Sequence, residues 1–231
     1  MLTRAGPLLF AGGFAFLLFV LLAELPFGDP VMAVGRVVLD EAAATVGAAN
    51  IVTSVVLAYR GIDTMGELAI LFAAATAAGL VLGHPGKADQ AEEPGGFILR
   101  AGADVLFPLL IVVGMYIILH GHLTPGGGFQ GGVVLATAFV LPVLARPGQV
   151  PSHGALAIVE GLAGAVFIAT GAAALAYDHE FLTPLLSPGR LGALVSAGTL
   201  PILYLAVGLK VGAELAGLLI RFTEADAESP R

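Results

Sequence analysis

The sequence predicts an all-α integral membrane protein with about six transmembrane helices, arranged as a module of two spans followed by a module of four. Composition is the first observation behind this fold class. Of the 231 residues, 58% are hydrophobic and 12% are charged, whereas soluble domains average about 45–50% apolar and about 25% charged residues. The second observation is a set of long apolar stretches, because a helix needs about 20 such residues to cross a bilayer. A disordered chain is excluded, since disorder requires low hydrophobicity and dense charge.

Four stretches reach the spanning length cleanly, namely Pro7 to Leu25, Glu67 to Gly83, Ile98 to Leu119, and Ala155 to Ala176. We interpret the first as a retained span, because no small-residue cleavage site follows it as it would follow a removed signal peptide. All four are therefore expected to cross the membrane.

Two further stretches need separate arguments. Phe129 to Ala145 is short but uncharged, and the glycines before it would let a helix begin within the membrane. Leu191 to Ile220 is longer than one straight span requires, so we expect tilt, projection beyond the membrane, or a kink at Pro201. A seventh span is possible at Ala42 to Ala58, but its polar residues make an in-plane or protein-buried helix an equal alternative.

A polar stretch rich in proline and glycine divides the chain. We expect a two-span module at residues 1–83, a linker at 84–97, a four-span module at 98–220 and a polar tail at 221–231. With six spans, basic residues fall unequally on the two sides of the membrane, and the richer side is cytoplasmic. The richer side holds Arg4, Lys87, Arg100, Arg146, Arg221 and Arg231, and the other holds Arg36, Arg60 and Arg190. Both termini are therefore predicted to be cytoplasmic, in a multi-pass protein of the inner (plasma) membrane.

Charge and cysteine content narrow the chemistry. The net charge of −7 argues against nucleic acid as a partner. The absence of cysteine from the sequence excludes disulfides, iron–sulfur ligation and thiolate zinc sites. No catalytic constellation or cofactor motif emerges, so we expect no cofactor, no resident metal and no enzymatic activity of this chain alone.

The stretch Y-R-G-I-D-T-M-G-E, from Tyr59 to Glu67, leads into the second span. If it is helical, Asp63 and Glu67 lie four residues apart on one face, where like charges cost about 0.2–0.5 kcal/mol. Arg60 could offset this repulsion as part of a surface ion pair. A bound cation, a shared proton or a lysine of a partner subunit could offset it in a transport site.

A glycine-rich segment, H-G-H-L-T-P-G-G-G-F-Q-G-G, begins at His120. It contains G-x-G-x-x-G, but no strand precedes it and no acidic residue follows at the distance that a dinucleotide site requires. We expect a structural role, in a tight re-entrant turn and in close helix contact, for Pro125, Gly126, Gly127, Gly128, Gly131 and Gly132. His120 and His122 form a weak metal pair; interfacial histidines bonded to the backbone, or a proton-handling role, are the alternatives.

Charged residues also fall within the apolar spans. An unpaired charge at mid-bilayer costs at least about 2.5–3.5 kcal/mol, so such residues usually face protein or water and mark ion routes. Lys210 and Glu214 lie four residues apart and can neutralise each other, either as a structural ion pair or as a proton relay. Glu160 has no charged neighbour within a helical turn, and we expect a neighbouring subunit to supply its partner.

These motifs resemble a known group of proteins. The G-H-x-T-P-G-G-G-F-Q-G-G element at Gly121 to Gly132, together with G-L-K-V-G at Gly208 to Gly212, makes residues 98–220 similar to the MnhB/MrpB subunit of Mrp-type Na+/H+ antiporters. The R-G-x-D-T-x-G-E element at Arg60 to Glu67 resembles MbhE, a small subunit of membrane-bound hydrogenases that corresponds to the C-terminal part of the Mrp A subunit.

The resemblance implies an accessory membrane subunit of a multisubunit cation (sodium)/proton antiporter that helps form the ion-translocation region. Its partners would be other membrane subunits, the lipid bilayer and the transported Na+ and H+. The ion-translocation candidates are then Asp63, Glu67, His120, His122, Glu160, Lys210 and Glu214. The alternative is a membrane subunit of an ion-pumping membrane-bound hydrogenase or related complex I-like oxidoreductase. A third possibility is a scaffold whose charges only hold helices together.

Overall fold

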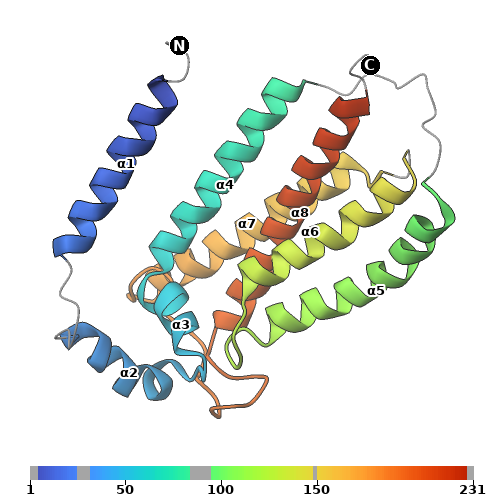
Figure 1. Cartoon of the computed structure of the whole chain (residues 1–231). Helices are drawn as coiled ribbons and strands as arrows, with labels where there is room; N and C mark the ends of the chain where they lie inside the picture. The colour runs from blue at the N-terminus through green and yellow to red at the C-terminus, as the bar shows by residue number, and fades with distance from the viewer. Residues whose placement is uncertain (1–4, 25–31, 84–94, 148–149, 228–231) are drawn as a thin grey trace. The chain divides into compact units, whose positions relative to one another are not determined.

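The computed structural model describes residues 5–24, 32–83, 95–147 and 150–227, which are helical apart from turns, loops and one isolated bridge between Gly189 and Ser196 (Figure 1). Six helices in this part of the chain are long and apolar enough to cross a membrane, which confirms the predicted all-α membrane fold. They are α1 (Ala5–Glu24), α4 (Gly61–Leu82), α5 (Phe97–Leu119), α6 (Gly128–Ala145), α7 (His153–Ala176) and α8 (Leu200–Ala227). The predicted linker at 84–97 lies largely outside the described residues.

The chain forms two compact units, Met1–Val37 and Val38–Arg231. The first contains α1, which carries no charged residue before Glu24 and is apolar on every face. A helix of that composition suits lipid or the interior of a membrane assembly. The second unit contains the remaining candidate spans and all of the charged residues discussed below.

The possible seventh span does not form one straight helix. α2 (Ala33–Val46) and the following short helix α3 (Ile51–Thr53), which continues as a π-helical turn η2 (Ser54–Tyr59), meet at an angle of 90°. Gly47 lies at this break with φ +76°, a conformation that glycine adopts without strain. A Cβ there would lie 2.6 Å from the carbonyl oxygen of Pro188, so the break is also tightly packed.

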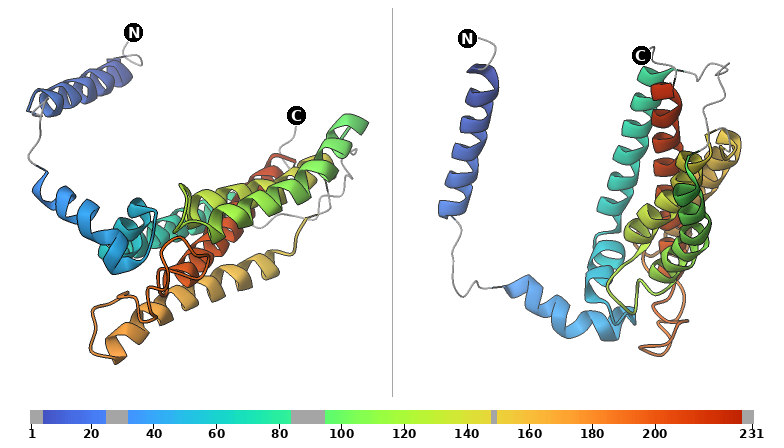
Figure 2. Two further views of the ribbon diagram at one scale, coloured as in Figure 1. Left: turned by 90° about the horizontal axis from the view of Figure 1, so that it is seen from below. Right: turned by 45° about the vertical axis from the view of Figure 1, so that its right-hand side comes forward.

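α8 is the central helix of the second unit. It packs against α4, α5, α6 and α7, and Figures 1 and 2 show it running beside α4 and α6. The expectation that the last span starts near Leu191 is wrong, because residues 191–199 form a loop and the helix begins at Leu200. Pro201 therefore lies in the first turn, where its missing N–H costs no hydrogen bond, and it starts the helix instead of kinking it.

Glycines bring α5, α6 and α8 into backbone contact. A Cβ on Gly132 of α6 would lie 2.8 Å from the carbonyl oxygen of Gly208 on α8, and one on Gly131 would lie 2.7 Å from the carbonyl oxygen of Gly114 on α5. Gly126 and Gly127, with φ +145° and +134°, form the turn before α6. Larger side chains at the helical positions Gly131 and Gly132 would push α5, α6 and α8 apart.

Candidate functional site

Three charged side chains meet between α7 and α8. The ammonium of Lys210 donates a hydrogen bond of 3.1 Å to Oε1 of Glu160 and lies 3.3 Å from Oε2 of Glu214. The side chains are 11%, 20% and 2% exposed for Lys210, Glu160 and Glu214. The expectation that another subunit must supply the partner of Glu160 is therefore wrong. Packing of α7 on α8 brings together residues 50 positions apart in the sequence.

The charges of this cluster do not balance. Fully ionised, it holds two carboxylates and one ammonium, a sum of −1. Both carboxylate oxygens of Glu214 lack a hydrogen bond of good geometry within the described part of the chain, although Oε2 lies close to Lys210. The ring of Phe72 on α4 lies 5.0 Å from the ammonium and provides a cation–π contact. Because an uncompensated charge is costly in a bilayer, the cluster is suited to take up one proton or one further cation.

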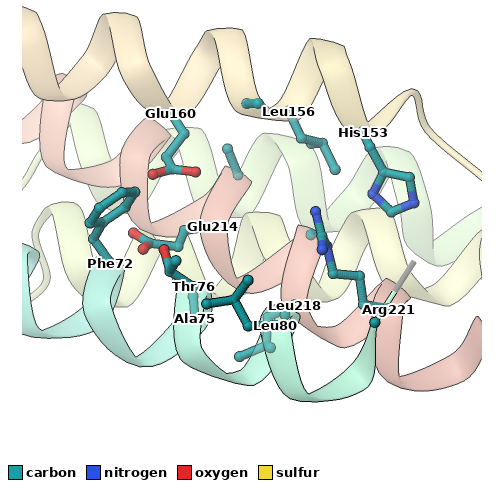
Figure 3. Close-up of a pocket in the computed structure, with 15 residues that line it drawn as sticks. Phe72, Ala75, Thr76, Leu80, His153, Leu156, Glu160, Glu214, Leu218 and Arg221 are labelled. Carbon is teal, nitrogen blue, oxygen red and sulfur yellow. The ribbon is translucent and has the colours of Figure 1, made fainter. Parts of the chain in front are cut away.

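A cavity of about 270 Å³ adjoins the cluster between α4, α7 and α8 (Figure 3). Its lining residues are Phe72, Ala75, Thr76, Gly79, Leu80, Gly83, His153, Leu156, Ala157, Glu160, Ala213, Glu214, Gly217, Leu218 and Arg221. Figure 3 shows the carboxylates of Glu160 and Glu214 near Phe72, whereas His153 and Arg221 lie at the opposite end. The cavity thus connects the buried cluster with a second set of ionisable groups.

That second set lies near the ends of helices. His153, the first residue of α7, has its Nε2 3.1 and 3.2 Å from the carboxylate oxygens of Glu224 on α8. The guanidinium of Arg221 extends over Gly79 of α4, where an added Cβ would lie 3.1 Å from Nη1. Sequence reasoning missed His153 and Arg221 as part of a site, since each looks like an ordinary polar residue at a helix end.

The predicted pair of acids at the start of α4 has a different environment. The guanidinium of Arg60 forms a hydrogen-bonded ion pair with Asp63, with side chains 69% and 52% exposed. Glu67 is also exposed, and neither acid lines the cavity. For Asp63 the geometry is that of the surface ion pair with Arg60.

The two histidines of the glycine-rich segment contact backbone carbonyls. His120 Nδ1 lies 3.1 Å from the oxygen of Tyr116, and the fully buried His122 donates from Nε2 to the oxygen of Ala193 at 3.4 Å. Burial lowers the pKa of His122, which favours the neutral imidazole. Within the described ranges, no group of three or more His, Cys, Asp or Glu residues is arranged to hold a metal ion.

A further ion pair links α5 to the residue that follows α6. Asp104 of α5 accepts a hydrogen bond of 2.7 Å from Arg146, which follows α6. This bond raises the pKa of the Arg146 guanidinium above its ordinary value. The two residues lie 42 positions apart, so nothing in the local sequence indicates the pairing.

Fold and site together define a polytopic membrane protein with a buried, charge-imbalanced cluster beside a cavity. Residues 98–217 match the family described as a domain related to the MnhB subunit of Na+/H+ antiporters. The match covers more than half of the chain, and the protein belongs to this family, as the glycine-rich motif predicted.

Relatives and solved structures extend this likeness over most of the chain. An uncharacterized protein of Methanocaldococcus jannaschii is 31% identical over 199 residues, covering 73% of this chain and 74% of the relative. A chain of the membrane-bound sulfane sulfur reductase, an archaeal respiratory membrane complex, superposes with a TM-score of 0.83 at 39% identity, covering 96% of this chain and 98% of that one. A chain of the Mrp complex from Dietzia sp. superposes with a TM-score of 0.74 at 26% identity, covering 94% of this chain and 26% of that one.

Proposed function

We propose that this protein is an accessory membrane subunit of a cation/proton antiporter-type complex and helps form its ion-translocation region. Membership of the MnhB-related family supports the class of complex. The likeness to chains of two multisubunit membrane complexes supports other membrane subunits as partners. Na+ and H+ are the transported ions, and no chemical step is catalysed by this chain itself.

The buried cluster of Glu160, Lys210 and Glu214 is the observation that carries the translocation role. One lysine can balance only one of the two acids, so the ionised cluster keeps a net charge that an added proton or cation would neutralise. When Glu214 takes up a proton, Lys210 remains paired with Glu160 alone. When that proton leaves, the ammonium is shared again. The cluster can therefore exist in two charge states that differ by one proton without a large rearrangement.

Asp63 and Glu67 form a second candidate place on the ion route. They lie on the first turns of α4, the helix whose Phe72 contacts Lys210. Their exposure in the isolated chain suits a surface that a partner subunit covers. We propose that Glu67 faces a cavity shared with that partner, while Arg60 holds Asp63.

The experiment that tests the function is Glu214→Gln in the intact complex. The neutral, isosteric side chain balances the cluster permanently, so the complex should assemble normally while sodium-dependent proton exchange falls severalfold. Glu180→Gln removes an exposed acid outside the cavity and serves as the control. Normal exchange by an assembled Glu214→Gln complex over a range of pH and sodium would leave only the scaffold role.

The alternative is a membrane subunit of an ion-pumping respiratory complex, related to membrane-bound hydrogenases, in which other subunits carry the redox chemistry. The specific observation in its favour is the match to 98% of the sulfane sulfur reductase chain, against 26% of the Mrp chain. Purification of the native complex decides, because co-purifying redox subunits would favour this alternative and antiporter subunits alone would favour the first.

We further propose the membrane topology and module boundaries that the sequence predicts. Both termini face the cytoplasm, and residues 1–83 and 98–220 form two fused modules. In this arrangement the C-terminal end of α8, with Arg221, lies on the cytoplasmic side. Protease protection of a C-terminal tag in oriented vesicles tests the orientation.

A further inference from the structure

The cavity beside the charge cluster is a groove with a defined direction. α4 and α7 both pack against α8 but, within the described residues, not against each other. The space between them is floored by α8, and six of its lining residues are alanine or glycine, namely Ala75, Gly79, Gly83, Ala157, Ala213 and Gly217. Small side chains here leave room for water where larger ones would close the groove.

The two ends of the groove lie at different depths. The inner end holds Glu160 and Glu214, and the outer end holds His153 and Arg221 (Figure 3). Each acid is seven residues from the outer group on its own helix, which corresponds to about 10 Å at 1.5 Å per residue. The outer end lies at the C-terminal cap of α4 and the start of α7. In helices of spanning length, such ends lie near a membrane face.

Polar groups continue along this path. Thr76 lies between the two ends, and His153 is paired with Glu224 at the outer end. The titratable side chains that line the groove come from α7 (Glu160 and His153) and from α8 (Glu214 and Arg221), and α4 contributes none to the lining. Lys210 contacts the two acids at the inner end, and Glu224 pairs with His153 at the outer end. The side chain of Glu214 is 2% exposed and lines the groove, and its carboxylate makes no well-formed hydrogen bond to the part of the chain that the structure describes.

The geometry at the inner end favours protons over metal ions. Hard cations require several oxygen ligands, but the ammonium of Lys210 already occupies the position between the two carboxylates, at 3.1 and 3.3 Å. The ring of Phe72 covers the ammonium from α4. A proton carried by water needs only one free carboxylate oxygen, and Glu214 offers one.

We propose that the groove is a hydrated proton pathway that connects Glu214 with the membrane face at the C-terminal end of α8, and with that face only. The inference rests on the proposed function and adds the ion and its side of access. It assigns His153, Glu224 and Arg221 to the outer opening of the pathway.

Cysteine labelling tests the pathway directly, because the native chain contains no cysteine. Gly217→Cys and Ala157→Cys place single thiols in the groove of the intact complex, with an affinity tag identifying this subunit. A membrane-impermeant charged thiol reagent should label both from the face that carries the C-terminus, in vesicles of one orientation only. Ala136→Cys on α6, which is 1% exposed, should remain unlabelled from either face. Labelling from the opposite face, or no labelling at either groove position, would overturn the pathway.

A steric block provides the second test. Leucine at Gly217 extends into the groove, since the nearest atom to an added Cβ is Leu156 Cδ1 at 3.9 Å. Gly217→Leu should lower proton transport severalfold in an assembled complex, whereas Gly161→Leu, with nothing within 4 Å of the added Cβ, should not. Normal transport by assembled Gly217→Leu would overturn the pathway; if that variant does not assemble, the labelling of Ala157→Cys decides.

The pathway and the proposed function fail in distinguishable ways. If Glu214→Gln transports normally, the function is wrong whatever the labelling shows. If Glu214→Gln lowers exchange while the groove thiols react from neither face, the function stands and the access route is wrong.

Discussion

α8 packs in two contrasting ways on its two sides. Toward α6 its backbone is in direct contact, and an added Cβ on Gly132 would meet the carbonyl oxygen of Gly208 at 2.8 Å. Toward α4 and α7 it places Lys210 and Glu214 beside a cavity of about 270 Å³. One side is close-packed and uncharged, and the other is open and charged.

Small residues occur on both sides, so composition alone does not explain the difference. Gly208 and Gly132 face each other across two adjacent helices, and their lack of side chains permits backbone contact. Gly217 faces the space between α4 and α7, and no backbone fills it: the nearest atom to an added Cβ is 3.9 Å away. A glycine on a membrane helix therefore produces tight packing or a groove according to what lies opposite.

The largest effect is expected on the charged side, from Lys210→Met. Removing the ammonium leaves two carboxylates without their shared partner, and breaking a buried ion pair in this way costs about 3–5 kcal/mol. We expect loss of complex assembly or a marked fall in its melting temperature. Adding Glu160→Gln and Glu214→Gln to Lys210→Met should restore much of the stability, because no buried charge then remains. If Lys210→Met alone were as stable as the wild type, the three side chains would not form the ion-paired cluster that the structure describes.

The next largest effect is expected on the close-packed side, from Gly132→Leu. The new side chain would collide with Val211 and with the backbone of Gly208, and overpacking of this kind costs about 1–3 kcal/mol, occasionally more. The measurement is the melting temperature and the yield of the assembled complex. Gly161→Leu, which meets open space, is the matched control. Equal tolerance of both variants would contradict the contrast between the two sides of α8.

Much of the fold could be predicted from the sequence, for physical reasons. Lipid imposes both a length and an apolar composition on each span, so hydropathy located the six helices. The start of α8 was missed because proline suits a helix start as well as a kink, and the sequence did not show that Pro201 follows a loop. The break after α2 depends on contact between Gly47 and Pro188, which no local pattern reveals.

The candidate site was only partly predictable. Lys210 and Glu214 could be paired from their spacing of four residues, and the structure places them 3.3 Å apart. The partner of Glu160 could not be predicted, because the packing of α7 on α8 decides which residue of α8 lies beside Glu160. The groove could not be predicted either, since it forms because α4 and α7 both pack on α8 and, as far as the structure describes the chain, not on each other.

A pH effect of smaller size is expected at the turn that precedes α6. Burial lowers the pKa of His122 from its ordinary value of 6.5, so below that pH the unfolded chain binds more protons than the folded one. The stability contributed by neutral His122 is therefore complete above about pH 6.5 and declines as the pH falls below it. Melting curves of the wild type and of His122→Gln across this range measure the effect. The wild type should lose more stability on acidification than the variant, and parallel curves would contradict the assignment.

The smallest effect on stability is expected at Asp63 and Glu67, the exposed acids of α4. Their charges lie outside the groove, so they can be compared with the buried acids inside it. An exposed ion pair such as Arg60–Asp63 is worth only about 0–1 kcal/mol, so Arg60→Ala should leave assembly nearly unchanged. Glu67→Gln should also assemble, because Glu67 is exposed in the isolated chain. If Glu67 lies on the ion route, this variant lowers sodium-dependent proton exchange and shifts its pH profile, while Glu180→Gln does not. Exchange at the wild-type level in an intact Glu67→Gln complex would confine the translocation role to the buried cluster on α8, and would show that burial distinguishes the transport acids from the surface ones.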